Sequence, residues 1–308
     1  MSRIILQTPP NAGGDATLPR TPPPPPPATE RVAYAPSGKV LPLWPSQPPG
    51  ETAPARTEYS TIVRGYVHGD HINVNDVWAP GIEVFPAPAD KNTGAAVIVC
   101  PGGCYSFLSY TMEGTEMAPW LNALGVTCVV LKYRVPARAN AGRGAMELMD
   151  AQRALSLVRS RAAEWKLDPA RIGIMGFSAG AHLSAVSASA PRRTYEPVDA
   201  VDGHCCRPNF TILLYSAYVF ETGAENGPEI AVTSATPPAI LIHAADDPYP
   251  VESSIVYYNA MRKAGVPVEL HLYATGGHGY GLRPTGYPCQ TWTACVAAWL
   301  KVNGWLKP

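Results

Sequence analysis

The chain has 308 residues, of which 46% are hydrophobic, so it can bury a large core as one large domain or two small ones. Lysine plus arginine and aspartate plus glutamate number 24 each, and no long basic run is present, which excludes a nucleic-acid footprint and a polybasic membrane patch. The longest apolar runs have the length of strands, which excludes a transmembrane helix.

The N-terminal part of the chain is rich in proline. Residues 1–60 hold 15 of the 34 prolines, including the six-proline run Pro22–Pro27. Such a segment forms neither helix nor sheet, so we predict an extended or disordered arm over residues 1–40 and one compact domain over residues 41–308. The first residues, MSRIILQTPP, contain no apolar core of signal-peptide length. The expected location is cytoplasmic if Met1 is the natural start, and secreted or periplasmic if a leader has been removed.

From residue 41 onward, predicted strands and helices alternate. Continuous apolar runs at Ala95–Cys100 and Val126–Tyr133 are typical of strands buried on both faces, and a helix is expected between them over Thr115–Ala123. A long amphipathic helix over Ala145–Trp165 is expected to face the sheet with Met149, Ala154, Leu155 and Val158. The later strands are predicted at residues 172–175, 210–215, 239–243 and 268–273, and the later helices at residues 179–189, 251–264 and 291–302. This order predicts a doubly wound, mostly parallel sheet with helices on both faces.

A serine lies where a predicted strand passes into a predicted helix, in the sequence Gly176-Phe-Ser178-Ala-Gly180. This is the G-x-S-x-G pattern of a nucleophile elbow, a tight turn that projects the serine hydroxyl out of the backbone. Gly176 and Gly180 are needed because a side chain at either position would collide across the turn. The first N–H groups of the following helix face the serine and favour negative charge there. Ser178 is therefore the predicted nucleophile.

A serine nucleophile needs a histidine as base and a carboxylate that orients the histidine. With the chain order serine, acid, histidine, the acid is expected after a late strand, where Asp246 and Asp247 stand, and His278 follows one helix and one strand later. Asp247 is favoured because it lies four residues after the strand residue His243, but Asp246 remains an alternative. The remaining histidines are predicted to have no catalytic role: His68, His71, His182, His204, His243 and His271.

The oxyanion formed in acyl transfer requires backbone N–H donors. One is expected from Ala179, directly after the nucleophile, and the other from Gly103 or Cys104 in the loop that follows strand Ala95–Cys100. A bound metal or other cofactor is not expected, since no His/Cys cluster has ligand spacing. The seven cysteines, an odd number, argue against a complete disulfide framework.

With these residues in place, the chain resembles the α/β-hydrolase esterases grouped with acetylxylan esterases and carbohydrate acetyl and feruloyl esterases. The resemblance covers about residues 41–306 and rests on the segments VIVCPGGCYSFL, WLNALGVTCVVLKYRVP, DAQRALSLVRSRAAEW, IGIMGFSAGAHLSA, HAADDP and GGHGYGL. It implies the α/β-hydrolase fold and metal-free hydrolysis of carboxylic esters through an acyl-enzyme. It also implies a substrate pocket near Tyr105 and Glu113. The corresponding loop of these esterases usually reads PGGGY. In this chain Cys104 replaces the third glycine, and its thiol could crowd or polarise the oxyanion site.

The resulting hypothesis is a serine carboxylesterase that removes acetyl or other small acyl groups from carbohydrates such as acetylated xylan. The alternatives are a general short-chain carboxylesterase, a feruloyl esterase or a formamidase-type amide hydrolase. A more remote alternative is a non-catalytic binding protein on the hydrolase fold. The expected partner is a small-molecule or oligosaccharide ester, not nucleic acid or a membrane, and the sequence is compatible with a homo-oligomer.

Overall fold

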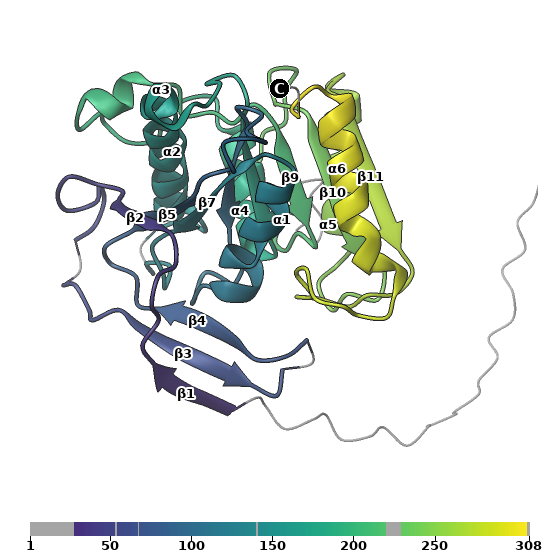
Figure 1. The fold of residues 1–308 in the computed structure, drawn as a ribbon, viewed down its shortest axis with the longest axis horizontal. Coiled ribbons are helices and arrows are strands. Elements are labelled where there is room, and N and C mark those ends of the chain that lie inside the picture. Colours follow the sequence, from purple (N-terminus) through teal and green to yellow (C-terminus); the bar gives the residue numbers. More distant parts are fainter. Residues whose placement is uncertain (1–27, 53, 67, 140, 220–228, 307–308) are drawn as a thin grey trace, which may run out of the picture.

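The computed structural model describes residues 28–52, 54–66, 68–139, 141–219 and 229–306 (Figure 1). Its main sheet consists of the strands β2 (Lys39–Pro42), β5 (Gly81–Phe85), β6 (Ala96–Cys100), β7 (Thr127–Lys132), β8 (Ile172–Phe177), β9 (Thr211–Leu214), β10 (Ala239–Ala244) and β11 (Val268–Tyr273). Their order is β11-β10-β9-β8-β6-β7-β5-β2. Every neighbouring pair from β11 to β7 is parallel, whereas β5 and β2 are added antiparallel at one edge. The predicted mostly parallel sheet is confirmed.

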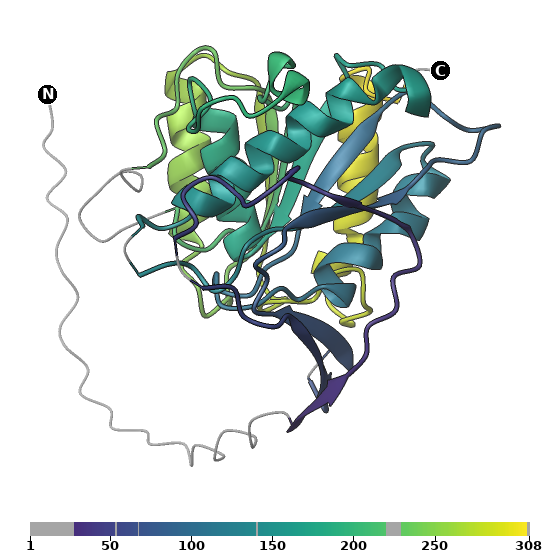
Figure 2. The same ribbon diagram turned by 90° about the vertical axis from the view of Figure 1, so that its left-hand side faces the viewer.

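Helices cover both faces of this sheet (Figure 2). The helices α1 (Met117–Ala123) and α6 (Trp292–Val302) lie on one face, and α2 (Ala145–Ser160), α4 (Ala179–Ser189) and α5 (Glu252–Lys263) lie on the other. All residues of β6 and β8 are buried, as expected of central strands between two helical layers. No helix in the described part of the chain is long and apolar enough to cross a bilayer.

Two predicted helices differ in detail from the observed ones. The long helix expected over residues 145–165 is interrupted at Arg161, where φ is −98° and ψ is 5°, and a short helix α3 (Ala162–Trp165) follows. The helix expected from Thr115 is preceded by a π-helical turn, Thr111–Thr115, and α1 begins at Met117. This turn lies beside β6, where it places Glu113 under the loop that follows the strand.

A second, three-stranded antiparallel sheet was not predicted. It has the order β1-β3-β4, with β1 (Ala28–Val32), β3 (Tyr59–Arg64) and β4 (His71–Asn75). Residues 28–40, which the sequence assigned to the extended arm, therefore contribute β1 and the start of β2. The high proline content of the first 60 residues led to the prediction of an arm without strands. The stretch from Ala28 to Ala35 contains no proline, however, so it keeps the N–H groups that a strand needs. The run Pro22–Pro27 lies outside the described residues.

Candidate active site

The turn between β8 and α4 has the geometry of a nucleophile elbow. Ser178 adopts φ 53° and ψ −120°, a strained combination for a residue with a side chain. A Cβ atom at Gly176 would lie 2.0 Å from the carbonyl oxygen of Gly180, and one at Gly180 would lie 2.0 Å from the carbonyl oxygen of Cys100. Both glycines are therefore required by close backbone contacts, as the sequence predicted.

The structure brings Ser178, His278 and Asp247 together from three separate segments. Nε2 of His278 lies 2.9 Å from Oγ of Ser178, and Nδ1 of His278 lies 2.8 Å from Oδ2 of Asp247. The three groups form a continuous chain of hydrogen bonds from the serine hydroxyl to a carboxylate whose side chain is fully buried. A neutral His278 that donates from Nδ1 and accepts at Nε2 satisfies both contacts.

The two adjacent aspartates occupy different environments. Asp246 is exposed, and its Oδ1 accepts a hydrogen bond from the Gly277 amide at 2.8 Å, so it supports the loop before the histidine. Asp247 faces His278, and its Oδ1 accepts from the Tyr249 amide at 2.7 Å. Burial alone would raise the pKa of the Asp247 carboxyl, but its contacts with His243, His278 and the Tyr249 amide outweigh burial and hold that pKa below its usual value. Asp247 is therefore kept ionised beside the histidine.

Three backbone amides near Ser178 are available to a ligand. Within the described residues, the N–H groups of Gly103, Cys104 and Ala179 donate to no protein acceptor. Ala179 is the first residue of α4, where the N–H groups of a helix have no partner in the helix itself. Gly103 and Cys104 both have positive φ, at 130° and 54°, in the loop after β6. These are the amides that the sequence predicted as oxyanion donors.

Glu113 and Tyr105, the two residues predicted at the substrate pocket, differ in their placement. Glu113 reaches the cavity beside Ser178, but its carboxylate is buried and accepts hydrogen bonds from the Gly102 amide at 3.0 Å and the Tyr215 hydroxyl at 2.8 Å. Its burial raises the pKa of the Glu113 carboxyl. Tyr105 does not line this cavity. It is buried, and its hydroxyl lies 2.7 Å from Nδ1 of His182. The family resemblance implied that Tyr105 lies at the pocket, but its ring is buried in the core, and its φ is 57°.

A cavity of about 130 Å³ lies beside the serine and histidine. Cys104 lines it and is exposed, and its Sγ lies 3.2 Å from the hydroxyl of Tyr249, another lining residue. Tyr66 and His71 form a further wall, although no role was predicted for His71. Both come from the β3–β4 segment, which the sequence did not predict, so no local signal identified them.

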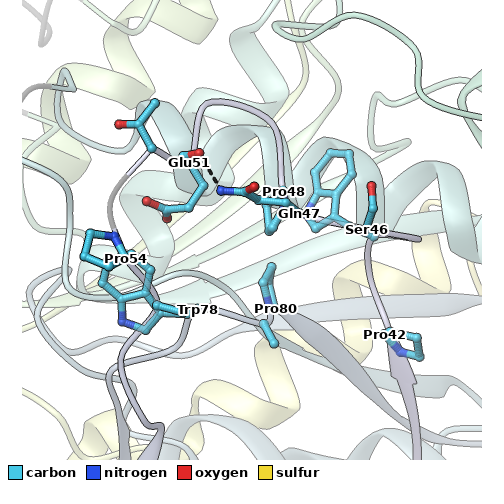
Figure 3. Close-up of a pocket in the computed structure, with 12 residues that line it drawn as sticks. Pro42, Ser46, Gln47, Pro48, Glu51, Pro54, Trp78 and Pro80 are labelled. Carbon is cyan, nitrogen blue, oxygen red and sulfur yellow. Dashed lines mark hydrogen bonds between the residues drawn. The ribbon is translucent and has the colours of Figure 1, made fainter.

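A larger hollow of about 690 Å³ lies elsewhere on the molecule (Figure 3). It is lined by residues between Pro42 and Ala55 and between Trp78 and Pro80, and it includes neither the elbow serine nor the histidine bonded to it. Pro54 and Trp78 are both among the residues that line this hollow. The guanidinium of Arg138 lies 3.7 Å from the ring centre of Trp78, so one face of the indole is already covered. We therefore assign the candidate active site to the smaller cavity.

Metal-ligating side chains do not gather in the described residues, where no group of three or more His, Cys, Asp or Glu could hold an ion. All seven cysteines are free thiols, and Cys100 and Cys128 are buried in the core.

Comparison with known proteins identifies the fold to which this arrangement belongs. The family model described as BD-FAE matches residues 82–209. An acetyl ester-xyloside bifunctional hydrolase from Caldicellulosiruptor lactoaceticus has a solved structure that matches with a TM-score of 0.71 at 29% identity, covering 89% of this chain and 99% of that one. The chain is an α/β-hydrolase. A butyrate-bound esterase from Thermogutta terrifontis supports the same fold, with a TM-score of 0.64 at 22% identity over 75% of this chain and 91% of that one.

This α/β-hydrolase also resembles acetylxylan esterases in sequence. One from Xylanibacter ruminicola is 35% identical over 217 residues, which make up 62% of this chain and 42% of that protein. A probable carboxylic ester hydrolase from Mycobacterium tuberculosis is 30% identical over 154 residues, which make up 48% of this chain and 35% of that protein. The chain thus spans less than half the length of these two relatives. The resemblance inferred from the sequence motifs is confirmed.

Proposed function

We propose that this protein is a serine carboxylesterase that removes acetyl or other small acyl groups from carbohydrates such as acetylated xylan. The observation that carries the proposal is the hydrogen-bonded series Ser178–His278–Asp247, with contacts of 2.9 and 2.8 Å, beside an open cavity. Its relatives include proteins described as acetylxylan esterase and as carboxylic ester hydrolase, which supports ester hydrolysis as the reaction.

In this mechanism the Ser178 hydroxyl oxygen attacks the carbonyl carbon of the ester while Nε2 of His278 accepts the hydroxyl proton. His278 then gives that proton to the oxygen of the leaving alcohol as the carbon–oxygen bond breaks, and the acyl group remains on Ser178. Water attacks the acyl-enzyme with His278 again as base, which releases the acid and restores the serine. Asp247 accepts the Nδ1–H hydrogen bond throughout and stabilises the imidazolium.

The negative charge on the carbonyl oxygen is stabilised by backbone amides in this proposal. Ala179 supplies one N–H group, and Gly103 or Cys104 supplies the other, since these amides have no protein acceptor among the described residues. The start of α4 adds a favourable electrostatic potential at the same point. A carbonyl oxygen that becomes an oxyanion there gains hydrogen bonds at the moment when its charge develops.

The size of the cavity favours a small acyl group. A volume of about 130 Å³, narrowed by Cys104 and Tyr249, suits acetyl better than a long chain. A panel of p-nitrophenyl esters from acetate to octanoate, together with acetylated xylan, a feruloyl ester and a formamide, separates the proposed activity from the alternatives. Preference for acetylated xylan and acetate supports the proposal, whereas preference for the feruloyl ester or the formamide would reassign the substrate.

The replacement Ser178→Ala tests the chemistry directly. Loss of the nucleophile is expected to lower kcat by about 10⁴- to 10⁶-fold with the fold intact. Ser187→Ala is the matched control, because Ser187 lies on the same helix and bonds only to the Leu183 carbonyl oxygen in the described structure. A serine-directed phosphonate should add once, to Ser178. Normal turnover by Ser178→Ala would refute the serine mechanism, and a folded wild type without turnover on any ester would favour a binding protein.

A further inference from the structure

A second histidine lies against the buried carboxylate of Asp247. His243 stands near the end of β10, four residues before Asp247, and is completely buried. Its Nε2 lies 3.3 Å from Oδ2 of Asp247, the same oxygen that His278 contacts. On the other side of the ring, Nδ1 lies 2.8 Å from the hydroxyl oxygen of Ser254 on α5.

These contacts determine which nitrogen of His243 carries the proton. Within the described residues, Nε2 has no hydrogen-bond partner of ordinary geometry, and Oδ2 of Asp247 is the acceptor beside it. An unprotonated Nε2 would direct its lone pair at a carboxylate oxygen, which is unfavourable in a buried site. A hydroxyl can donate or accept, so Ser254 can donate to Nδ1 and leave the proton on Nε2. His243 therefore presents an N–H group to Asp247.

We propose that His243 is a positioning residue that holds the Asp247 carboxylate in the rotation required by His278. This inference rests on the proposed function. The Tyr249 amide fixes Oδ1 at 2.7 Å, while His278 and His243 share Oδ2. Because the Asp247 side chain is fully buried, solvent water cannot replace the His243 donor. The distance of 3.3 Å between Nε2 of His243 and Oδ2 of Asp247 is long for a hydrogen bond. Catalytic hydrogen bonds are often long before substrate binds, and we expect this one to shorten when His278 becomes an imidazolium.

The alternative is that His243 only fills space between β10 and α5, and three variants separate the two roles. His243→Leu removes both ring nitrogens, and His243→Asn offers an amide at the position of Nδ1 that does not reach Asp247. His243→Gln places an amide N–H near the position of Nε2. We expect His243→Leu and His243→Asn to lower kcat by about 10- to 100-fold with KM little changed, because the hydrogen bond to the charged Asp247 carboxylate is lost. We expect His243→Gln to retain most of the wild-type kcat.

Ser254→Ala is the matched control, since it removes the buried hydrogen bond to Nδ1 but leaves the Nε2–H group facing Asp247. It should lose stability much as His243→Leu does, by thermal unfolding, while it retains most of kcat. If Ser254→Ala and His243→Leu lose kcat equally, the ring acts through packing and the inference is wrong. Should His243→Leu fail to fold, His243→Asn and His243→Gln are compared instead. Equal kcat values for these two variants would likewise mean that the inference is wrong.

A double-mutant cycle with Asp247→Asn tests whether His243 acts through this carboxylate. His243→Leu should lower kcat in the wild type but have little further effect when Asp247 is already replaced. An equal loss in both backgrounds would overturn the inference. Its failure is distinct from a failure of the proposed function, because an inactive Ser178→Ala beside a fully active His243→Leu leaves the serine mechanism intact and removes only the role of His243.

Discussion

Asp246 and Asp247 are neighbours in the chain but perform different tasks in the structure. Asp247 faces Nδ1 of His278, whereas Asp246 accepts a hydrogen bond from the Gly277 amide. We predict that Asp247→Asn lowers kcat by about 10⁴-fold, because an amide at this position favours the wrong tautomer of the histidine. Asp246→Asn should cost less than tenfold, since an amide oxygen can still accept from Gly277. Steady-state kinetics of both variants on p-nitrophenyl acetate measure the difference, and the reverse ranking would transfer the acid role to Asp246.

Cys104 is the residue at which this chain departs from the glycine that is usual in the esterases it resembles. Its φ of 54° suits glycine, so Cys104→Gly is expected to keep the stability of the protein or raise it slightly. The thiol beside the Tyr249 hydroxyl is removed, which widens the cavity. We predict that kcat/KM for butyrate and octanoate esters rises relative to that for acetate. An unchanged ratio among the three esters would show that the thiol does not limit acyl length.

The elbow is the element on which the site depends most strongly. Gly180→Ala would place a Cβ atom 2.0 Å from the Cys100 carbonyl oxygen and 2.5 Å from that of Pro101, so α4 must move away from β6. We predict a loss of several kcal/mol in the free energy of unfolding, about 2–4, and loss of activity in whatever protein still folds. Gly203→Ala is the control, because nothing lies within 4 Å of its added Cβ. Urea unfolding compares the two, and equal small effects would contradict the close contact.

The central elements were predictable because their sequence signals are local. Continuous apolar runs identified β6 and β7, and the glycines around Ser178 identified the elbow, so a mostly parallel sheet could be predicted, although the order of its strands was not. Strands β1 to β5 were missed because they are short and partly polar and depend on partners distant in the chain, as in the pairing of β1 with β3. For the same reason, no local pattern could show that His71 lines the cavity. His243 and Asp247 are only four residues apart, but their contact depends on the turn that follows β10, which the sequence pattern does not show.

At the scale of the whole molecule, buried carboxylates make stability depend on pH. Burial raises the pKa of Glu147 on α2 from 4.5 to about 7, and its Oε1 has no hydrogen-bond partner among the described residues. As pH rises from 4.5 towards 7, the unfolded chain ionises this group before the folded protein does, so this group's contribution to stability falls over that range. The contribution is fully present at lower pH and lost at higher pH.

The replacement Glu147→Gln should therefore stabilise the protein at pH 8 and not at pH 4. We expect a gain of about 1–3 kcal/mol in the free energy of unfolding at pH 8, because the neutral amide does not have to ionise in a buried position. Urea unfolding at both pH values measures it. Glu164→Gln serves as the control, since Glu164 is exposed and paired with Arg161. A gain that is equal at pH 4 and pH 8 would mean that ionisation of Glu147 is not its source.

In the cavity wall, His71 is the first residue of β4 in the β1-β3-β4 sheet and Tyr66 lies between β3 and β4, whereas Ser178, Asp247 and His278 follow strands of the main sheet. The candidate catalytic residues and part of the cavity wall are thus carried by two different sheets, which the backbone hydrogen bonds between Val74 and Leu108 join. If the proposed function is right, we expect substitutions at this wall to change which alcohol the site accepts without disturbing the serine, the histidine or their supporting glycines. The residues between β3 and β4 are therefore the first target for changing the selectivity of the proposed reaction.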